Sequence, residues 1–119
     1  MKAIVYRNYG SPDVLGLEEV PKPAPGDDEV LVKIHASSVN AWDWHNMRAT
    51  PLFARGTIGW FKPKTHILGA DVAGVVEAVG SNVKQFQPGD EVFGDLAGFG
   101  GGCFAEYVSV NENAFALKP

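Results

Sequence analysis

Apolar residues in this chain recur mostly at every second position in short runs, and glycine or proline separates one run from the next. This pattern predicts β-strands. The clearest run is Glu29 to Val39. Its alternating side chains place Val30, Val32, Ile34 and Ala36 on one face and Leu31, Lys33 and His35 on the other. We therefore predict an amphipathic strand with one face against a core.

Shorter runs predict four more strands, at Lys2 to Tyr6, Val14 to Val20, Cys103 to Val110 and Ala114 to Pro119. Prolines between residues 21 and 26 predict an extended connector, because proline fixes φ and cannot donate to a sheet. Asn40 to Met47 shows no alternation and opens with a good cap residue, so we predict a short helix there. Ala49 to His66 is predicted to be a long loop, and Asp95 to Gly102 a glycine-rich one.

The stretch from Ile67 to Gly94 is the centre of the predicted fold. An apolar run from Val75 to Val79 is followed by a turn, and Glu91 to Phe93 is apolar again after Gln87-Pro88-Gly89-Asp90. Proline at the first corner and glycine at the second favour a type II turn, which needs a positive φ at the glycine. We predict a strand, a reversal and a second strand.

Many short strands, many turns and few helices predict one mostly β domain, a small, partly open antiparallel barrel with one or two short helices. The chain has 119 residues, enough for one core without disulfides. With 14 acidic and 10 basic residues its net charge is -4, which argues against nucleic acid and anionic membranes as partners. No apolar run approaches the roughly 18 residues of a membrane span, and no leader precedes residue 1, so we expect a cytoplasmic protein.

Cys103 is the single cysteine, which excludes an internal disulfide and a zinc site made of several cysteines. The histidines His35, His45 and His66 have no zinc-motif spacing with each other or with the nearby aspartates. We therefore predict no metal site.

The pattern G-A-D-x-A-G-x-V-x-x-V-G-x-x-V-x-x-F-x-x-G-D-x-V, which begins at Gly69, resembles the signature of the catalytic domain of medium-chain dehydrogenases and reductases. MKAIVYRNYG, ASSVNAWDW and CFAEYVSV resemble further parts of that domain, so the resemblance covers essentially all of 1–119. It implies a GroES-like fold. Zinc-dependent members have histidine where this chain has Ala70 and cysteine where it has Asn40, so the resemblance is to the zinc-independent quinone reductases.

The resemblance implies that the site lies in the stretch from Asn40 to Arg48. Candidate catalytic residues are Asn40, Asp43 and His45, and candidate substrate-binding residues are Trp44, Arg48 and Asp71. The amide of Asn40 can donate and accept, which suits orienting a substrate carbonyl or the ribose of a nicotinamide cofactor. Each residue also has a plainer interpretation: Asn40 as a helix cap, Asp43 with Arg48 as an ion pair, and Trp44 and His45 as packing.

Gly98-Phe99-Gly100-Gly101-Gly102-Cys103 begins like a dinucleotide fingerprint, but the third glycine is missing and a strand is predicted to follow. The helix N-terminus that binds a pyrophosphate is therefore absent. The family implies a Rossmann domain that follows residue 119 in a longer parent and holds NADPH or NADH.

These features predict the catalytic domain of a homodimeric NAD(P)H-dependent oxidoreductase that reduces quinones or α,β-unsaturated carbonyls without zinc. Two alternatives remain open. One is a zinc-type alcohol dehydrogenase domain with displaced ligands, and the other is a non-enzymatic GroES-like binding or assembly module.

Overall fold

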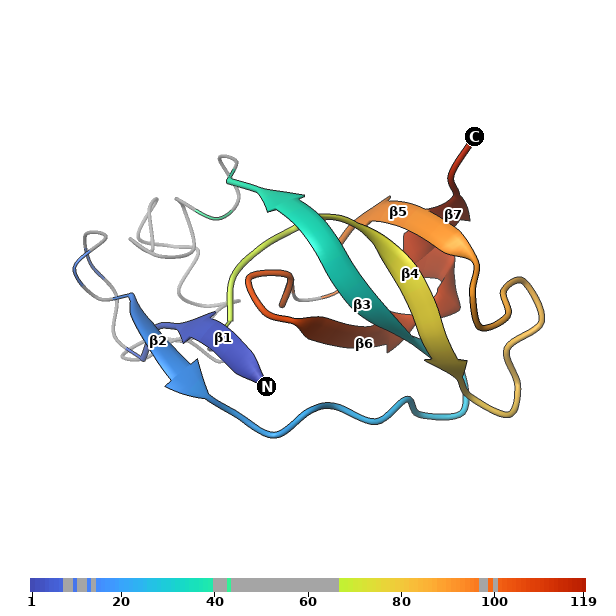
Figure 1. The fold of residues 1–119 in the computed structure, drawn as a ribbon, viewed down its shortest axis with the longest axis horizontal. Helices are drawn as coiled ribbons and strands as arrows, with labels where there is room; N and C mark the ends of the chain where they lie inside the picture. The colour runs from blue at the N-terminus through green and yellow to red at the C-terminus, as the bar shows by residue number, and fades with distance from the viewer. Residues whose placement is uncertain are drawn as a thin grey trace.

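The computed structural model describes residues 1–7, 10, 13, 15–39, 43, 67–96, 99 and 101–119. These residues form two antiparallel sheets (Figure 1). The strands are β1 (Lys2–Val5), β2 (Gly16–Glu19), β3 (Glu29–Ser38), β4 (Asp71–Val79), β5 (Glu91–Asp95), β6 (Tyr107–Asn111) and β7 (Phe115–Leu117). β1 pairs with β2, and the larger sheet has the order β6-β3-β4-β5-β7.

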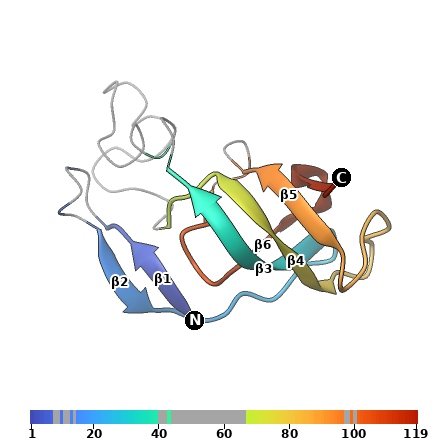
Figure 2. The ribbon, with the colours of Figure 1, turned by 45° about the horizontal axis from the view of Figure 1, so that its top comes forward.

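The segment before β6 joins the two sheets. Ile4 of β1 donates its backbone N–H to the Phe104 carbonyl at 2.8 Å, and Ile34 of β3 donates to the Glu106 carbonyl at 2.9 Å. Figure 2 shows β1 and β2 beside the larger sheet, and these two strands form a sheet of their own. Within the described residues the sheets do not close completely, which confirms the prediction of a partly open, mostly antiparallel β fold.

The main core lies against the inner face of the larger sheet. Its buried side chains include Val30 and Val32 of β3, Val76 of β4 and Val92 of β5, with Leu96 just beyond β5. A second, smaller cluster around Tyr6 and Leu68 lies under β1. Valine is frequent here because β-branched side chains pack well on a pleated surface.

The central strand–turn–strand prediction is confirmed. β4 and β5 pair antiparallel, and the Asp90 N–H donates to the Gln87 carbonyl at 3.1 Å across the turn. Gly89 has φ 97°, the positive value that the type II turn requires. β4 begins at Asp71, four positions before the apolar run that suggested it.

The predicted alternation along β3 holds only in part. The pairing of β3 with β4 shifts between Ile34 and Ala36, so His35 is an extra residue and Ala36 passes to the outer face opposite the exposed Ala73. Leu31, predicted to face outward, is 4% exposed. A bulge changes the face of every later residue, and no sequence pattern marked this one.

The strand predicted from Cys103 begins only at Tyr107. The four residues before it bond to other segments instead: Cys103 N–H to the Gly69 carbonyl, Phe104 N–H to the Leu68 carbonyl and Glu106 N–H to the Lys2 carbonyl. Of the predicted helix Asn40 to Met47 only Asp43 is described, and it has helical conformation. The predicted loop Ala49 to His66 lies outside the described residues. A 3-10 helix, η4 (Glu112–Ala114), is capped by Asn111.

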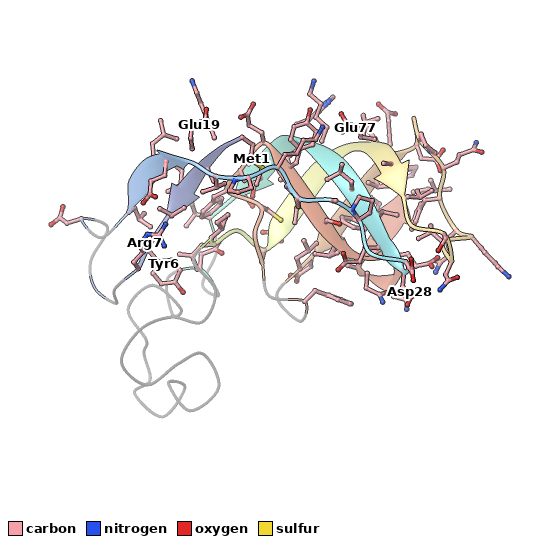
Figure 3. The ribbon with its side chains drawn as sticks, turned by 90° about the horizontal axis from the view of Figure 1, so that it is seen from below. Met1, Tyr6, Arg7, Glu19, Asp28 and Glu77 are labelled. Atoms are coloured by element: carbon pink, nitrogen blue, oxygen red, sulfur yellow. The ribbon has the colours of Figure 1, made fainter. Side chains whose placement is uncertain are left out.

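The connector between β2 and β3 is fastened to the outer face of the larger sheet. Lys22 contacts Glu77 of β4 at 2.6 Å between Nζ and Oε2, and its ammonium lies 4.2 Å from the centre of the Tyr107 ring of β6. Figure 3 looks at the molecule from this side and labels Glu77. No helix among the described residues is long and apolar enough to cross a membrane.

Candidate functional site

Three strand ends meet at one edge of the larger sheet. Ser38 at the end of β3 pairs with Asp71 at the start of β4, and Asp71 pairs with Asp95 at the end of β5. In Figure 1 the arrowheads of β3 and β5 point to this edge. We call it the Asp71 edge. Residues 40–48, which include most of the predicted site residues, follow β3 in the sequence, and Asp43 is the described residue among them.

Asp71 is held by two serines of β3. Ser38 Oγ donates to Asp71 Oδ2 at 2.9 Å, and Ser37 Oγ donates to the Asp71 backbone carbonyl at 2.5 Å. The carboxylate is half-buried and lies beside a cavity of about 330 Å³, whose lining includes Ala36, Ser37, Ser38, Asp71, Ala73 and Phe93. Phe93 is 45% exposed. The cavity therefore combines an aromatic face with hydroxyl and carboxylate groups, which suits a flat ligand with a polar end.

Asp43 is buried, with 2% of its surface exposed. Its Oδ1 accepts the Gly69 backbone N–H at 2.9 Å. Gly69 has φ 107°, and a Cβ there would lie 2.6 Å from Phe104 N and 2.9 Å from the Cys103 carbonyl carbon. Only glycine fits this backbone, because it alone adopts a positive φ freely and leaves room for the neighbouring chain.

The Cys103 thiol lies behind the edge and is buried. Its Sγ is 3.9 Å from the Ala70 carbonyl oxygen. Burial, and then the charges of Asp43, Asp71 and Asp95, raise the pKa of Cys103 to about 12. The free thiol is therefore protonated at neutral pH, the form that is a poor nucleophile.

Of the predicted site residues, the structure describes Asp43 and Asp71, and the charges of both act on the buried Cys103 thiol. Asn40, Trp44, His45 and Arg48 lie outside the described residues. Sequence reasoning missed Ser37, Ser38 and Phe93. The serines could have been found from the register of β3 against Asp71, but Phe93 carried no signal because an aromatic residue in a short strand predicts core.

Zinc does not fit the donor atoms at this edge. Ala70, which stands where zinc-dependent relatives have histidine, is 0% exposed and offers only a methyl group. Among the described residues no group of three or more histidine, cysteine, aspartate and glutamate side chains is arranged to hold a metal.

The described residues also do not fit the pyrophosphate of a dinucleotide. The segment from Gly101 leads through Phe104 into β6, so a strand and not a helix follows the glycines. No helix N-terminus is presented there to bind an anion.

Comparison with known proteins identifies the domain. Residues 26–119 match the alcohol dehydrogenase GroES-like domain. The chain belongs to this family. The quinone oxidoreductase of Coxiella burnetii has the same fold as this GroES-like domain, with a TM-score of 0.85 and 34% identity over 100% of this chain and 37% of that one.

Curated relatives are similar along the whole GroES-like domain. A chloroplastic quinone oxidoreductase of Triphysaria versicolor is 40% identical over 123 residues, which cover 100% of this chain and 35% of that protein. A chloroplastic NADPH-dependent alkenal/one oxidoreductase of Arabidopsis thaliana is 40% identical over 130 residues, covering 100% of this chain and 31% of that protein. The chain therefore spans about a third of the length of the curated relatives it matches.

These relatives correct one expectation. We expected a cytoplasmic protein because no apolar run was long enough to span a membrane and no leader was recognised. That expectation is wrong, because four similar relatives are named as chloroplast or chloroplast-envelope proteins. The residues of a folded domain do not specify a compartment.

Proposed function

We propose that this domain is the catalytic domain of a longer NAD(P)H-dependent reductase of quinones or α,β-unsaturated carbonyls, and that the parent is a homodimer. Two relatives with 40% identity along the whole domain support this, one named a quinone oxidoreductase and one an NADPH-dependent alkenal/one oxidoreductase. A nucleotide-binding domain after residue 119 would hold the cofactor, which supplies a hydride when bound.

The observation that carries the proposal is the pair of groups behind the Asp71 edge. Ala70 provides no metal ligand, and Cys103 stays protonated. In this proposal, negative charge that develops on the substrate oxygen during reduction is stabilised by hydrogen-bond donors of the protein or by water. The same pair argues against the alternative of a zinc alcohol dehydrogenase.

Within this proposal Asn40 and His45 are the candidate donors to the substrate oxygen. Trp44 and Arg48 lie in the same stretch of sequence and would contact the substrate or the cofactor. Asp71, fixed by Ser37 and Ser38, would line the substrate side of the cleft together with Phe93. A planar quinone or enone matches the aromatic face and polar end of this cavity.

The test is steady-state oxidation of NADPH and NADH by the full-length protein with a benzoquinone and a short-chain enone. Asn40→Ala should lower kcat/KM by roughly tenfold or more, the effect of losing one transition-state hydrogen bond of about 1.4 kcal/mol. Asn40→Asp and Asn40→Ser retain a capping oxygen but not the amide donor, so they should fold normally and lose activity as well. Asn82→Ala is the control, because it makes the same chemical change in the exposed turn after β4, at the end of β4 opposite to Asp71. It should leave kcat/KM unchanged.

Absence of saturable turnover with both substrate classes would contradict the proposed function. Full activity of Asn40→Asp and Asn40→Ser, with Asn40→Ala only less stable, would show that Asn40 is a helix cap.

A further inference from the structure

Asp43 is the one charged side chain among the described residues that is fully buried. Taking a carboxylate out of water is unfavourable unless hydrogen bonds replace its hydration. The Gly69 N–H supplies one of these bonds, at 2.9 Å to Oδ1. The burial is complete within this domain, before a second domain covers the Asp71 edge.

Gly69, which donates to Asp43, lies in a short segment whose backbone is hydrogen-bonded to neighbouring chain on two sides. On one side, the carbonyls of Leu68 and Gly69 accept the N–H groups of Phe104 and Cys103 at 2.9 and 3.0 Å. On the other side, the Ala70 carbonyl accepts the Leu96 N–H at 2.7 Å. Residues 68–70 are buried, and Gly69 is further locked by its close contact with Phe104. The backbone of residues 68–70 is therefore held in place, and it can hold Asp43 in place in turn.

We propose that Asp43 is a positioning residue, whose buried carboxylate fastens the segment with Asn40 and His45 to the backbone at Gly69. Asp43 lies three positions after Asn40 and two before His45 in the sequence, so we expect loss of its hydrogen bond to Gly69 to affect these two candidate donors as well. Asp43 then takes no part in proton transfer, although its residue type and place in the sequence suggest catalysis. The inference rests on the proposed function for the reaction that is positioned, whereas the anchor itself does not depend on it.

An anchor and an acid–base group respond differently to an isosteric change. Asp43→Asn keeps an oxygen that can accept the Gly69 N–H but removes the ionisable group, whereas Asp43→Ala removes both. Rescue by the asparagine variant is therefore expected of an anchor and not of a proton donor or acceptor. Asp28→Asn is the matched control, because Asp28 is exposed in the turn before β3, at the other end of that strand (Figure 3).

The experiment uses the full-length protein and two measurements. Hydrogen–deuterium exchange by mass spectrometry follows a peptide that contains Gly69, and kcat and KM for NADPH and a benzoquinone are measured from about pH 6 to 9. We expect Asp43→Ala to speed exchange at Gly69 at least tenfold and to lower kcat at least tenfold. Asp43→Asn should keep exchange and kcat within roughly threefold of the unmodified protein, with the same shape of pH profile. Asp28→Asn should change neither.

Two results would overturn the inference. One is unchanged exchange at Gly69 in Asp43→Ala, which would mean that no anchor exists. The other is normal exchange in Asp43→Asn combined with the kcat loss of Asp43→Ala or with loss of one limb of its pH profile, which would show that the reaction needs the charge or the proton of Asp43 and not only the anchor. If the unmodified protein reduces neither substrate class, the proposed function fails, and the exchange measurement still decides whether Asp43 is an anchor. If Asp43→Ala does not fold, the exchange and pH profile of Asp43→Asn decide the question.

Discussion

Gly69 leaves no space for a side chain. Its φ of 107° is one that residues with a Cβ rarely adopt, and the Phe104 backbone lies against its Cα. Gly69→Ala should therefore lower the free energy of unfolding by about 1–3 kcal/mol from backbone strain, and by more if residues 103 and 104 must move. The midpoint of urea denaturation measures this.

Gly16→Ala is the control for that prediction. Gly16 begins β2, and a Cβ added there meets nothing within 4 Å. The control should be neutral or stabilising by up to about 1 kcal/mol, because alanine restricts the unfolded chain. Equal midpoints for Gly69→Ala and Gly16→Ala would show that the backbone around Gly69 is not locked.

At the scale of residues, the sequence singled out Asp43 and Asp71 but not the contacts that they make. The structure describes both residues, and the charges of both raise the pKa of Cys103. What a spacing could not reveal is that Asp43 binds a backbone N–H 26 positions away. Almost every residue type has a backbone N–H, so the identity of the residue that donates it cannot be predicted from the sequence. Gly69 is glycine for another reason, which is its backbone conformation.

At the scale of elements, Lys22 fastens the connector across the outer face of the sheet. A hydrogen bond from Lys22 lowers the pKa of Glu77, and the same bond raises the pKa of Lys22, while partial desolvation opposes both shifts. The contribution of Glu77 to the free energy of unfolding is present above its ordinary pKa of 4.5 and is lost as the pH falls through its lowered pKa. The contribution of Lys22 to the same free energy is present below its ordinary pKa of 10.5 and is lost as the pH rises through its raised pKa.

Lys22→Gln should consequently lower the thermal midpoint slightly at neutral pH and low salt. The effect should shrink in high salt, because both groups are exposed and counter-ions screen their attraction. Lys84→Gln removes the same charge from an exposed position after β4 and should have no effect. Thermal melts at low and high salt measure both variants, and a salt-independent loss for Lys22→Gln would point to packing on Tyr107 in place of the ion pair.

The sequence predicted that these strands exist but not the residues at which they begin and end. The alternation in β3 and the turn at Gly89 are local signals, so the β3–β4–β5 part of the fold followed from the sequence. Residues 103–106 were assigned to a strand from their composition, but their backbone groups bond to residues near positions 2, 34 and 69. Such pairings depend on how distant segments meet, and neither propensity nor periodicity encodes them.

At the scale of the whole molecule, the purified protein should hold no zinc at the Asp71 edge. The Ala70 side chain has no donor atom, and among the described residues no group of histidine, cysteine, aspartate and glutamate side chains is arranged to hold a metal. Elemental analysis after dialysis should find no zinc retained by this domain, and a chelator should leave the thermal midpoint unchanged. About one zinc per chain of the 119-residue domain would contradict this prediction.

The order of strands in the larger sheet also has a consequence for biosynthesis. Glu29 at the start of β3 pairs with Asn111 at the end of β6, and Ala3 of β1 bridges to Ala105. A nascent chain leaving the ribosome can bring β3, β4 and β5 together early, but one side of β3 stays unpaired until residue 111 has emerged. Pairings this distant in sequence form slowly, and open strand edges invite association between chains. Translation through this last stretch should therefore be the period in which the nascent chain most needs a chaperone.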